Sequence, residues 1–103
     1  MIKVSVFYPN SKGSKFDMEY YTSKHMPMVQ TKLGKACRRI EVDQGVAGGT
    51  PGSAPAYSAI GHLFFESVEA FQAAFTPQAN TILADIPNYT NTQPTIQISE
   101  IML

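Results

Sequence analysis

Alternating apolar and polar residues predict four strands. Apolar side chains recur at every second position from Ile2 to Tyr8, and the same period returns in the stretches 36–46, 57–66 and about 95–103. Successive side chains of a strand point to opposite faces, so each stretch predicts one strand. Between the second and third stretches, residues 45–56 hold four glycines and two prolines without any period. This composition predicts a loop.

A first helix is predicted between Phe16 and Gly34. Asp17 can cap its N-terminus by accepting hydrogen bonds from free backbone N–H groups. The positions that follow place a mostly apolar stripe, which ends in an imidazole, on one helix face. This stripe consists of Met18, Tyr21, Thr22 and His25.

Pro27 is predicted to interrupt this helix. Proline donates no backbone hydrogen bond and clashes with the preceding turn, so the helix should end or kink near Met26. Pro27 also suits the first position of a second short helical segment that runs to Leu33 and ends at Gly34. His25 would then lie beside a break, where its side chain can face a cavity.

A second helical region follows the third strand. Ser67 is a favourable N-cap, and apolar residues recur behind it at helical spacing. Pro77 is predicted to break this helix, and a further short helix is expected over 78–85, closed by Pro87 and Asn88. The apolar stripe of the first part consists of Val68, Phe71, Ala74 and Phe75.

The predicted order of elements is β-α-β-β-α-β. This order defines the ferredoxin-like class of α+β folds, in which a four-stranded antiparallel sheet carries both helices on one face. A chain of 103 residues suits one domain spanning 1–103, since two separate cores would need more residues. The strands carry apolar residues on both sides, so the face without helices would expose apolar area. We therefore expect a homodimer.

Charge argues against two classes of partner. Lysine plus arginine and aspartate plus glutamate number 8 each, and no long basic run occurs, which disfavours nucleic acid and anionic membranes. The single cysteine, Cys37, excludes an intrachain disulfide and a cysteine-based zinc site, and it is compatible with a reducing compartment. The N-terminal apolar run is too short for a signal peptide, and no stretch reaches membrane-spanning length. A cytoplasmic protein is the expectation.

The chain resembles the EthD family of the dimeric α/β-barrel group. The resemblance covers nearly the whole chain, and its most specific part is the block from Tyr20-Tyr21 to His25-Met26-Pro27. It implies a dimer whose two sheets face each other to form a barrel, with a cavity in each subunit between sheet and helices. The other matching features are Tyr8-Pro9, Gly34, the segment Phe65-x-Ser67-x-Glu69-x-Phe71, and Asp85-x-Pro87-Asn88-Tyr89-Thr90.

His25 and Asp85 are the candidate catalytic residues. An imidazole with a pKa near 6.5 can accept or donate a proton at neutral pH, whereas the alternative is a histidine that caps a helix end or bonds inside the core. Asp85 matches an acidic position of the family and is flanked by apolar residues, where a carboxylate could orient His25 or act as a base. Its alternative role is to terminate a turn before Pro87.

Three further residues are candidates for a substrate pocket. Tyr20 and Tyr21 point about 100° apart on a helix, so at most one can share a pocket wall with His25, and Tyr21 is the nearer. His62 lies on the third predicted strand. It could face the interior of the barrel that the family resemblance implies, and the alternative is a position at the dimer interface or on the surface.

No cofactor or metal is predicted. The two histidines lie 37 positions apart and lack the spacing of a metal-binding motif. The loop glycines do not have the spacing of a dinucleotide fingerprint, so no phosphate-binding loop for flavin or nicotinamide is apparent. The chain is also shorter than the haem enzymes of this fold group tend to be.

These observations favour a small enzyme that transfers protons on an apolar or aromatic oxygenated substrate, as in isomerisation or ring closure. His25 would be the acid or base, Asp85 its partner, and Tyr21 a wall of the pocket. Two alternatives stay open. The protein could bind and carry a hydrophobic metabolite without catalysis, or it could be an oxidoreductase, as the label carried by many EthD-family members implies.

Overall fold

The computed structural model describes residues 1–103 and has the predicted β-α-β-β-α-β order. Each of the two helical regions consists of two α-helices that continue into one another through a short non-α turn. No helix is long and apolar enough to cross a membrane. The elements are β1 (Ile2–Pro9), α1 (Met18–Tyr20), α2 (Met26–Leu33), β2 (Arg39–Gln44), β3 (Tyr57–Phe65), α3 (Val68–Phe75), α4 (Ala79–Ala84) and β4 (Thr95–Glu100).

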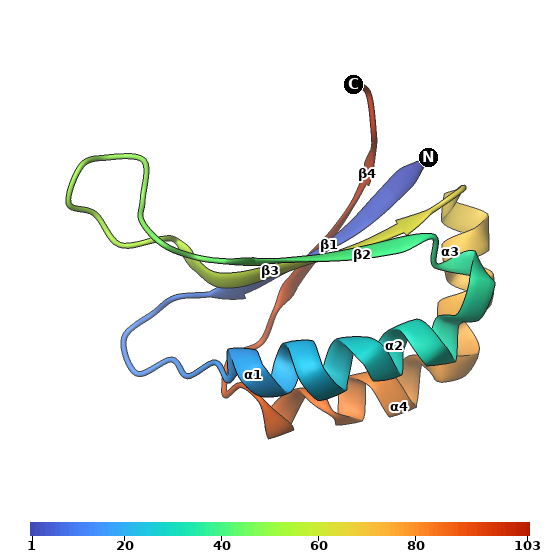
Figure 1. The fold of residues 1–103 in the computed structure, drawn as a ribbon, viewed down its shortest axis with the longest axis horizontal. Helices are drawn as coiled ribbons and strands as arrows, with labels where there is room; N and C mark the ends of the chain where they lie inside the picture. The colour runs from blue at the N-terminus through green and yellow to red at the C-terminus, as the bar shows by residue number, and fades with distance from the viewer.

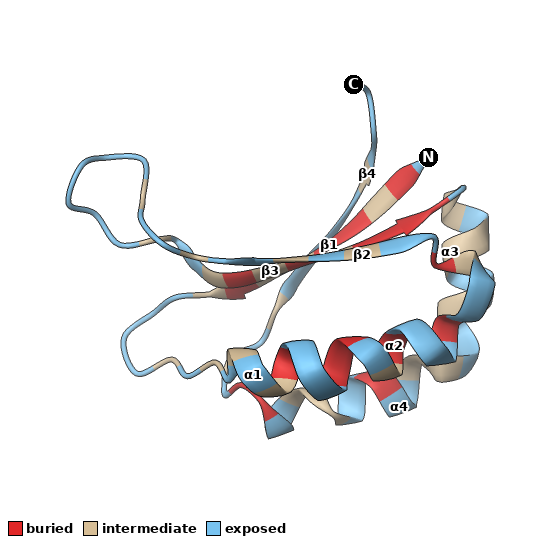
Figure 2. Ribbon diagram, viewed as in Figure 1, coloured by how far each residue is buried: buried red, intermediate tan, exposed pale blue.

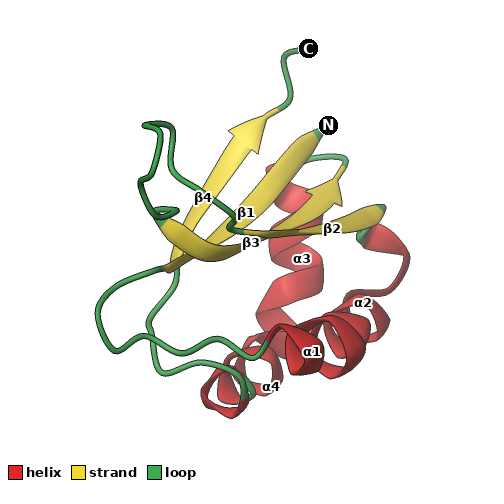
Figure 3. Cartoon of the chain, turned by 60° about the vertical axis from the view of Figure 1, so that its left-hand side comes forward, coloured by secondary structure: helices red, strands yellow, loops and turns green.

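The four strands form one antiparallel sheet in the order β2-β3-β1-β4. All four helices lie on the same face of this sheet, as Figures 1 and 3 show. Val4 of the central strand β1 pairs with Leu63 of β3 and with Ile98 of β4, which aligns apolar side chains across the helix-covered face. The predicted ferredoxin-like α+β fold is therefore confirmed.

The hydrophobic core fills the space between the sheet and the helices. In Figure 2 the buried positions of the turn Tyr21–His25 and of α2 face the sheet, while β4 and the loop 45–56 are mostly exposed. Burial of these side chains supplies the main favourable contribution to folding. The core consists of Ile2, Val4, Tyr8, Tyr21, Met26, Val29, Leu33, Cys37, Ala59, Leu63, Phe65, Ile82 and Tyr89.

The second helical segment predicted to begin at Pro27, run to Leu33 and end at Gly34 is present as α2, but it is joined to α1 without a chain break. The helix does not end near Met26, because a π-helical turn over Tyr21–His25 joins α1 to α2. In this turn the Met26 N–H donates to the Tyr21 carbonyl five residues back, and Pro27 occupies the first turn of α2, where its missing N–H costs least. The wider turn therefore accommodates the proline without ending the helix.

Several other boundaries differ from the prediction. A 3-10 turn over Thr76–Gln78 accommodates Pro77, so α3 and α4 form one bent helical region. The second strand covers only 39–44 of the expected 36–46, since a 3-10 turn occupies 34–36, and the last strand ends at Glu100. Val46, the last residue of the expected stretch, lies beyond the strand and is 89% exposed.

The sheet face without helices is more polar than expected. Phe7 and Ile60 are half-buried there, and Phe64 is covered by the Arg39 guanidinium, 4.2 Å from its ring centre. Between them, His62 bonds to Ser5 and Asp43, which breaks the apolar surface. The apolar side chains of this face are thus interrupted by polar groups.

Candidate active site

The π-helical turn places Tyr21 and His25 on the buried side of the first helical region. Both side chains are nearly inaccessible to solvent, and their rings stack with centres 5.5 Å apart. The start of this region is fixed by Asp17, whose carboxylate accepts a hydrogen bond from the Tyr20 N–H as an N-cap. The imidazole is therefore held between the helix and the sheet by local geometry.

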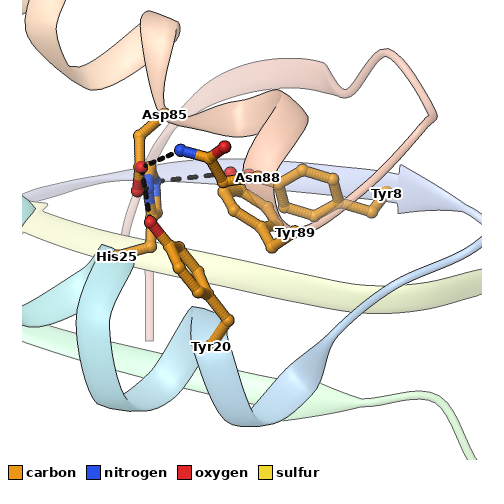
Figure 4. A network of polar contacts seen from close by, with 6 residues as sticks. All are labelled: Tyr8, Tyr20, His25, Asp85, Asn88 and Tyr89. Atoms are coloured by element: carbon orange, nitrogen blue, oxygen red, sulfur yellow. Dashed lines mark hydrogen bonds and ion pairs between the residues drawn. The ribbon is translucent and has the colours of Figure 1, made fainter.

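His25 is paired with Asp85, sixty residues later in the chain. The His25 Nδ1 and an Asp85 carboxylate oxygen are 2.9 Å apart, and the Asp85 side chain is 19% exposed. The other carboxylate oxygen accepts hydrogen bonds from the Tyr20 hydroxyl at 2.7 Å and the Asn88 amide at 2.9 Å. Figure 4 shows these three donors converging on the carboxylate, which fixes its orientation toward the imidazole.

The environment favours a neutral His25 beside an ionised Asp85. Burial lowers the pKa of His25 below its ordinary value of 6.5, and the opposing influence of Asp85 only partly offsets this. Burial alone would raise the pKa of Asp85, but hydrogen bonds from Asn88, Tyr20 and His25 outweigh it, so its pKa is lowered. At neutral pH, His25 can therefore donate its Nδ1 hydrogen to the carboxylate and keep a lone pair on Nε2.

Two buried tyrosines continue the hydrogen bonding on the other side of the imidazole. The Tyr89 hydroxyl lies 3.3 Å from His25 Nε2 and 2.6 Å from the Tyr8 hydroxyl. Burial is the largest influence on both phenols and raises their pKa values well above the ordinary range. Both tyrosines are thus neutral hydroxyls at physiological pH and act as hydrogen-bond donors.

A small apolar cavity of about 80 Å³ lies between the sheet and the helices beside His25. It is smaller than most ligand pockets, which measure about 300–1,000 Å³. Its lining residues with polar side-chain groups are His25, Tyr8 and Tyr21, and no aspartate, glutamate, lysine or arginine lines it. The other lining residues are Val4, Val6, Met26, Val29, Leu63, Phe71, Phe75, Ile82, Leu83, Ile86, Pro94 and Ile96.

The predicted site residues divide into three groups. His25 and Tyr21 line the cavity, whereas Asp85 and Tyr20 lie behind the imidazole and contact each other. His62 lies on the opposite face of the sheet, because its neighbours Gly61 and Leu63 point toward the helices and alternation turns it away. His62 therefore does not line this cavity, and its position on the helix-free face is the one that the predicted interior of a two-sheet barrel would require.

Sequence reasoning assigned no role to Tyr8, Asn88 or Tyr89. All three belong to segments quoted for the family resemblance, but no spacing rule connects them to His25. Tyr8 is 81 residues from Tyr89, and only the packing of β1 against the segment after α4 brings their hydroxyls together. One feature of the sequence could have pointed to Tyr8. It is a tyrosine at the end of a strand whose other core-facing positions, Ile2, Val4 and Val6, are aliphatic.

The side chains offer no evident metal site, since no three histidine, cysteine or carboxylate side chains cluster together. His25 is a potential proton acceptor whose imidazole lies beside an apolar cavity. A carboxylate oriented by three donors polarises the imidazole, and the imidazole forms part of the cavity wall. This arrangement suits general acid–base chemistry.

The fold and site together define a ferredoxin-like α+β protein with a buried histidine–aspartate pair beside an apolar cavity. The EthD domain model matches residues 14–93, a span that includes both members of the pair. The chain belongs to the EthD family.

Two relatives share substantial sequence. An EthD-like protein of known crystal structure from Ralstonia eutropha is 44% identical, with a TM-score of 0.95 over 99% of this chain and 92% of that one. An uncharacterised 11.0 kDa protein, encoded in the thcB–thcC intergenic region of Rhodococcus erythropolis, is 31% identical over 86% of this chain and 84% of its own length.

A more distant structure is similar in fold. An ethyl tert-butyl ether D (EthD) family protein from Bacillus halodurans is 20% identical, with a TM-score of 0.75 over 99% of both chains.

Proposed function

We propose that this protein is a cofactor-independent enzyme that transfers protons on a small, uncharged, apolar or aromatic oxygenated substrate. The observation that carries the proposal is the 2.9 Å contact between Asp85 and His25, whose imidazole lines the apolar cavity. A proton acceptor in a water-poor pocket, oriented from behind by a carboxylate, is the arrangement that general base catalysis requires. Isomerisation and ring closure are the reaction types that fit.

His25 acts as the base in this reaction. Its Nδ1–H donates to Asp85, so Nε2 keeps the lone pair that takes a proton from an activated C–H bond of the substrate once the Tyr89 hydroxyl, 3.3 Å away, turns from it. The imidazolium that forms is stabilised by the adjacent carboxylate, whose own position is fixed by Tyr20 and Asn88. Asp85 therefore serves as a positioning and stabilising residue and need not itself become protonated.

The lining of the cavity supports an uncharged substrate. A carboxylate or phosphate group would enter a space without any lysine or arginine, and its desolvation would not be compensated. A carbonyl or hydroxyl group can instead meet the tyrosine hydroxyls at one end while the hydrocarbon part packs against aliphatic side chains. The small cavity volume favours substrates the size of a single ring.

A carrier of apolar metabolites is the alternative that uses the same cavity. A carrier needs the apolar walls but gains nothing from a carboxylate that polarises the imidazole. The label carried by many family members implies an oxidoreductase. Such an enzyme would bind its substrate in this pocket and would need a separate redox partner. The buried His25–Asp85 pair favours proton transfer over both.

Deuterium exchange into cyclohexanone tests the proposal without knowledge of the natural substrate. The probe is a small neutral ketone, and a base in the cavity should remove its α-hydrogens, which deuterium oxide then replaces. We expect wild-type protein to accelerate this exchange, measured by proton NMR, and His25→Gln to lose at least about a hundredfold of the acceleration.

The matched control is His62→Gln, the same substitution on the opposite sheet face. Exchange at the wild-type rate is expected there. Equal rates for His25→Gln and wild type would contradict the role of His25. Binding of cyclohexanone by wild type with no exchange above the buffer rate would favour the carrier.

A further inference from the structure

The apolar cavity has a buried wall and an exposed mouth. The polar residues of its wall, Tyr8, Tyr21 and His25, are all buried. Leu83 and Ile96 line the same cavity, yet they are 47% and 51% exposed. Leu83 belongs to α4, and Ile96 belongs to β4, which Figure 3 shows at the edge of the sheet. The cavity therefore opens to solvent between α4 and the sheet edge.

The mouth of the cavity is apolar throughout. Single exposed apolar residues are ordinary on a protein surface, but Leu83 and Ile96 continue the lining of a cavity outward. No polar side chain accompanies them, because every lining residue that is not buried is apolar. The half-buried members of this lining are Val6, Phe71, Phe75, Ile86 and Pro94.

The size of the cavity limits what can lie inside it. Its volume of about 80 Å³ holds only part of an ordinary ligand, since most ligand pockets measure about 300–1,000 Å³. The remainder of a larger substrate must leave through the mouth, where it meets only hydrocarbon side chains. A side chain inserted from a second copy would instead fill the space beside His25 and exclude the substrate.

We propose that the substrate carries an unbranched hydrocarbon tail, which leaves the cavity through this mouth and packs against Leu83 and Ile96. The carbonyl or hydroxyl group enters first and lies toward the polar residues of the buried wall. The inference rests on the proposed function for this polar group and adds a substrate class to it. That class is an uncharged carbonyl compound or single ring that bears an alkyl tail.

The tail contributes to binding through the apolar area that it buries. A methylene group removed completely from water improves an affinity about fourfold, and one that is covered on one side improves it about twofold. Each methylene added to the tail should therefore improve the affinity about two- to fourfold while the chain still contacts the mouth. The gain should end once the chain extends past Leu83 and Ile96 into solvent.

The test is an NMR titration with the 2-alkanones from 2-butanone to 2-nonanone. These probes share one carbonyl group and differ only in the length of the tail. For wild-type protein we expect the dissociation constant to fall about two- to fourfold per methylene over the first members of the series. The methyl signals of Leu83 and Ile96 should shift more strongly with the longer ketones.

Leu83→Asn tests the mouth itself. The amide places a polar group where the tail should pack, so the ratio of the dissociation constants for 2-butanone and 2-nonanone should fall about tenfold. The variant should fold, since the side chain is 47% exposed. Val46→Asn is the matched control, because Val46 is 89% exposed and does not line the cavity. Its ratio should equal that of wild type.

Two results would overturn the tail site. They are equal dissociation constants for all the ketones, and a ratio in Leu83→Asn that matches wild type. The titrations need no turnover, so they are independent of the cyclohexanone exchange. A gain with chain length in a protein that does not exchange cyclohexanone would contradict the proposed function and support the tail site, whereas exchange without the gain would do the reverse.

Discussion

At the scale of single residues, the site depends on how burial and hydrogen bonding act on His25 in opposite directions. Burial removes the imidazole from water and favours the neutral form, and the Asp85 carboxylate opposes this. The sequence allowed His25 and Asp85 to be selected as a pair, from residue chemistry and family resemblance. It could not show that Tyr20 and Asn88 hold the carboxylate, because those contacts depend on the orientation of side chains across two helical regions.

The lowered pKa of His25 predicts how stability depends on pH. The unfolded chain binds a proton to this histidine as the pH falls below 6.5, whereas the folded protein does not. The associated stability is therefore present above pH 6.5 and is lost as the pH falls toward the folded-state pKa. Urea unfolding at about pH 7.5 and pH 5.5 should show a lower free energy of unfolding at the acidic value.

His25→Gln provides the comparison for this prediction. The variant lacks the titrating group, so its free energy of unfolding should change less between the same two pH values, while His62→Gln should follow wild type. An equal loss of stability in His25→Gln and wild type would show that His25 is not the group responsible.

The same pKa direction predicts the pH dependence of catalysis. Only neutral His25 can accept a proton, so cyclohexanone exchange should rise with pH through the folded-state pKa, below 6.5, and then level off at neutral pH. The measurement is the exchange rate across this range. A midpoint well above pH 6.5 would contradict the lowered pKa of His25, in which the effect of burial exceeds the opposing effect of Asp85.

At the scale of elements, the first helical region and β3 fit together through Gly61. A Cβ atom at this position would clash with the Tyr21 hydroxyl, so the glycine provides the space that the tyrosine occupies. The strand alternation indicated that Gly61 leaves space for close approach of another group. The π-helical turn that delivers Tyr21 to it was not predictable, because a proline in a helical pattern more often marks an end than a widened turn.

Gly61→Ala should therefore destabilise the protein by about 1–3 kcal/mol, since the added methyl group would displace the buried Tyr21 hydroxyl from its position. Urea unfolding measures this, and the aromatic NMR signals of Tyr21 should shift. The matched control is Gly49→Ala, where an added Cβ has no neighbour within 4 Å and the backbone is not left-handed. Equal stability of the two variants would contradict the tight contact at Gly61.

At the scale of the whole molecule, the order of elements was predictable and the meeting of distant segments was not. Periodicity defines each strand and helix locally, and the β-α-β-β-α-β order then leaves few topologies. The pairing of β1 with both β3 and β4 brings Tyr8 close to Tyr89 and sets the cavity against His25. These contacts join residues about sixty to eighty positions apart, so no local pattern encodes them.

A homodimer remains our proposal for the assembled state. Ile96 and Ile98 of the edge strand β4 are 51% and 40% exposed, and Ile96 also lines the cavity, so a second copy could cover this apolar edge. Size-exclusion chromatography with light scattering at micromolar concentration should give twice the mass of the 11.3 kDa chain. A mass of one chain would contradict the proposal.

His25 as a neutral base is tested most directly by a long-range proton–nitrogen NMR correlation spectrum of its imidazole at about pH 7. We predict hydrogen on Nδ1, which donates to Asp85, and none on Nε2, with this form persisting until the pH falls below 6.5. A hydrogen on Nε2 at neutral pH, in either an imidazolium or the other neutral form, would leave no lone pair for the substrate proton and would contradict the proposed function.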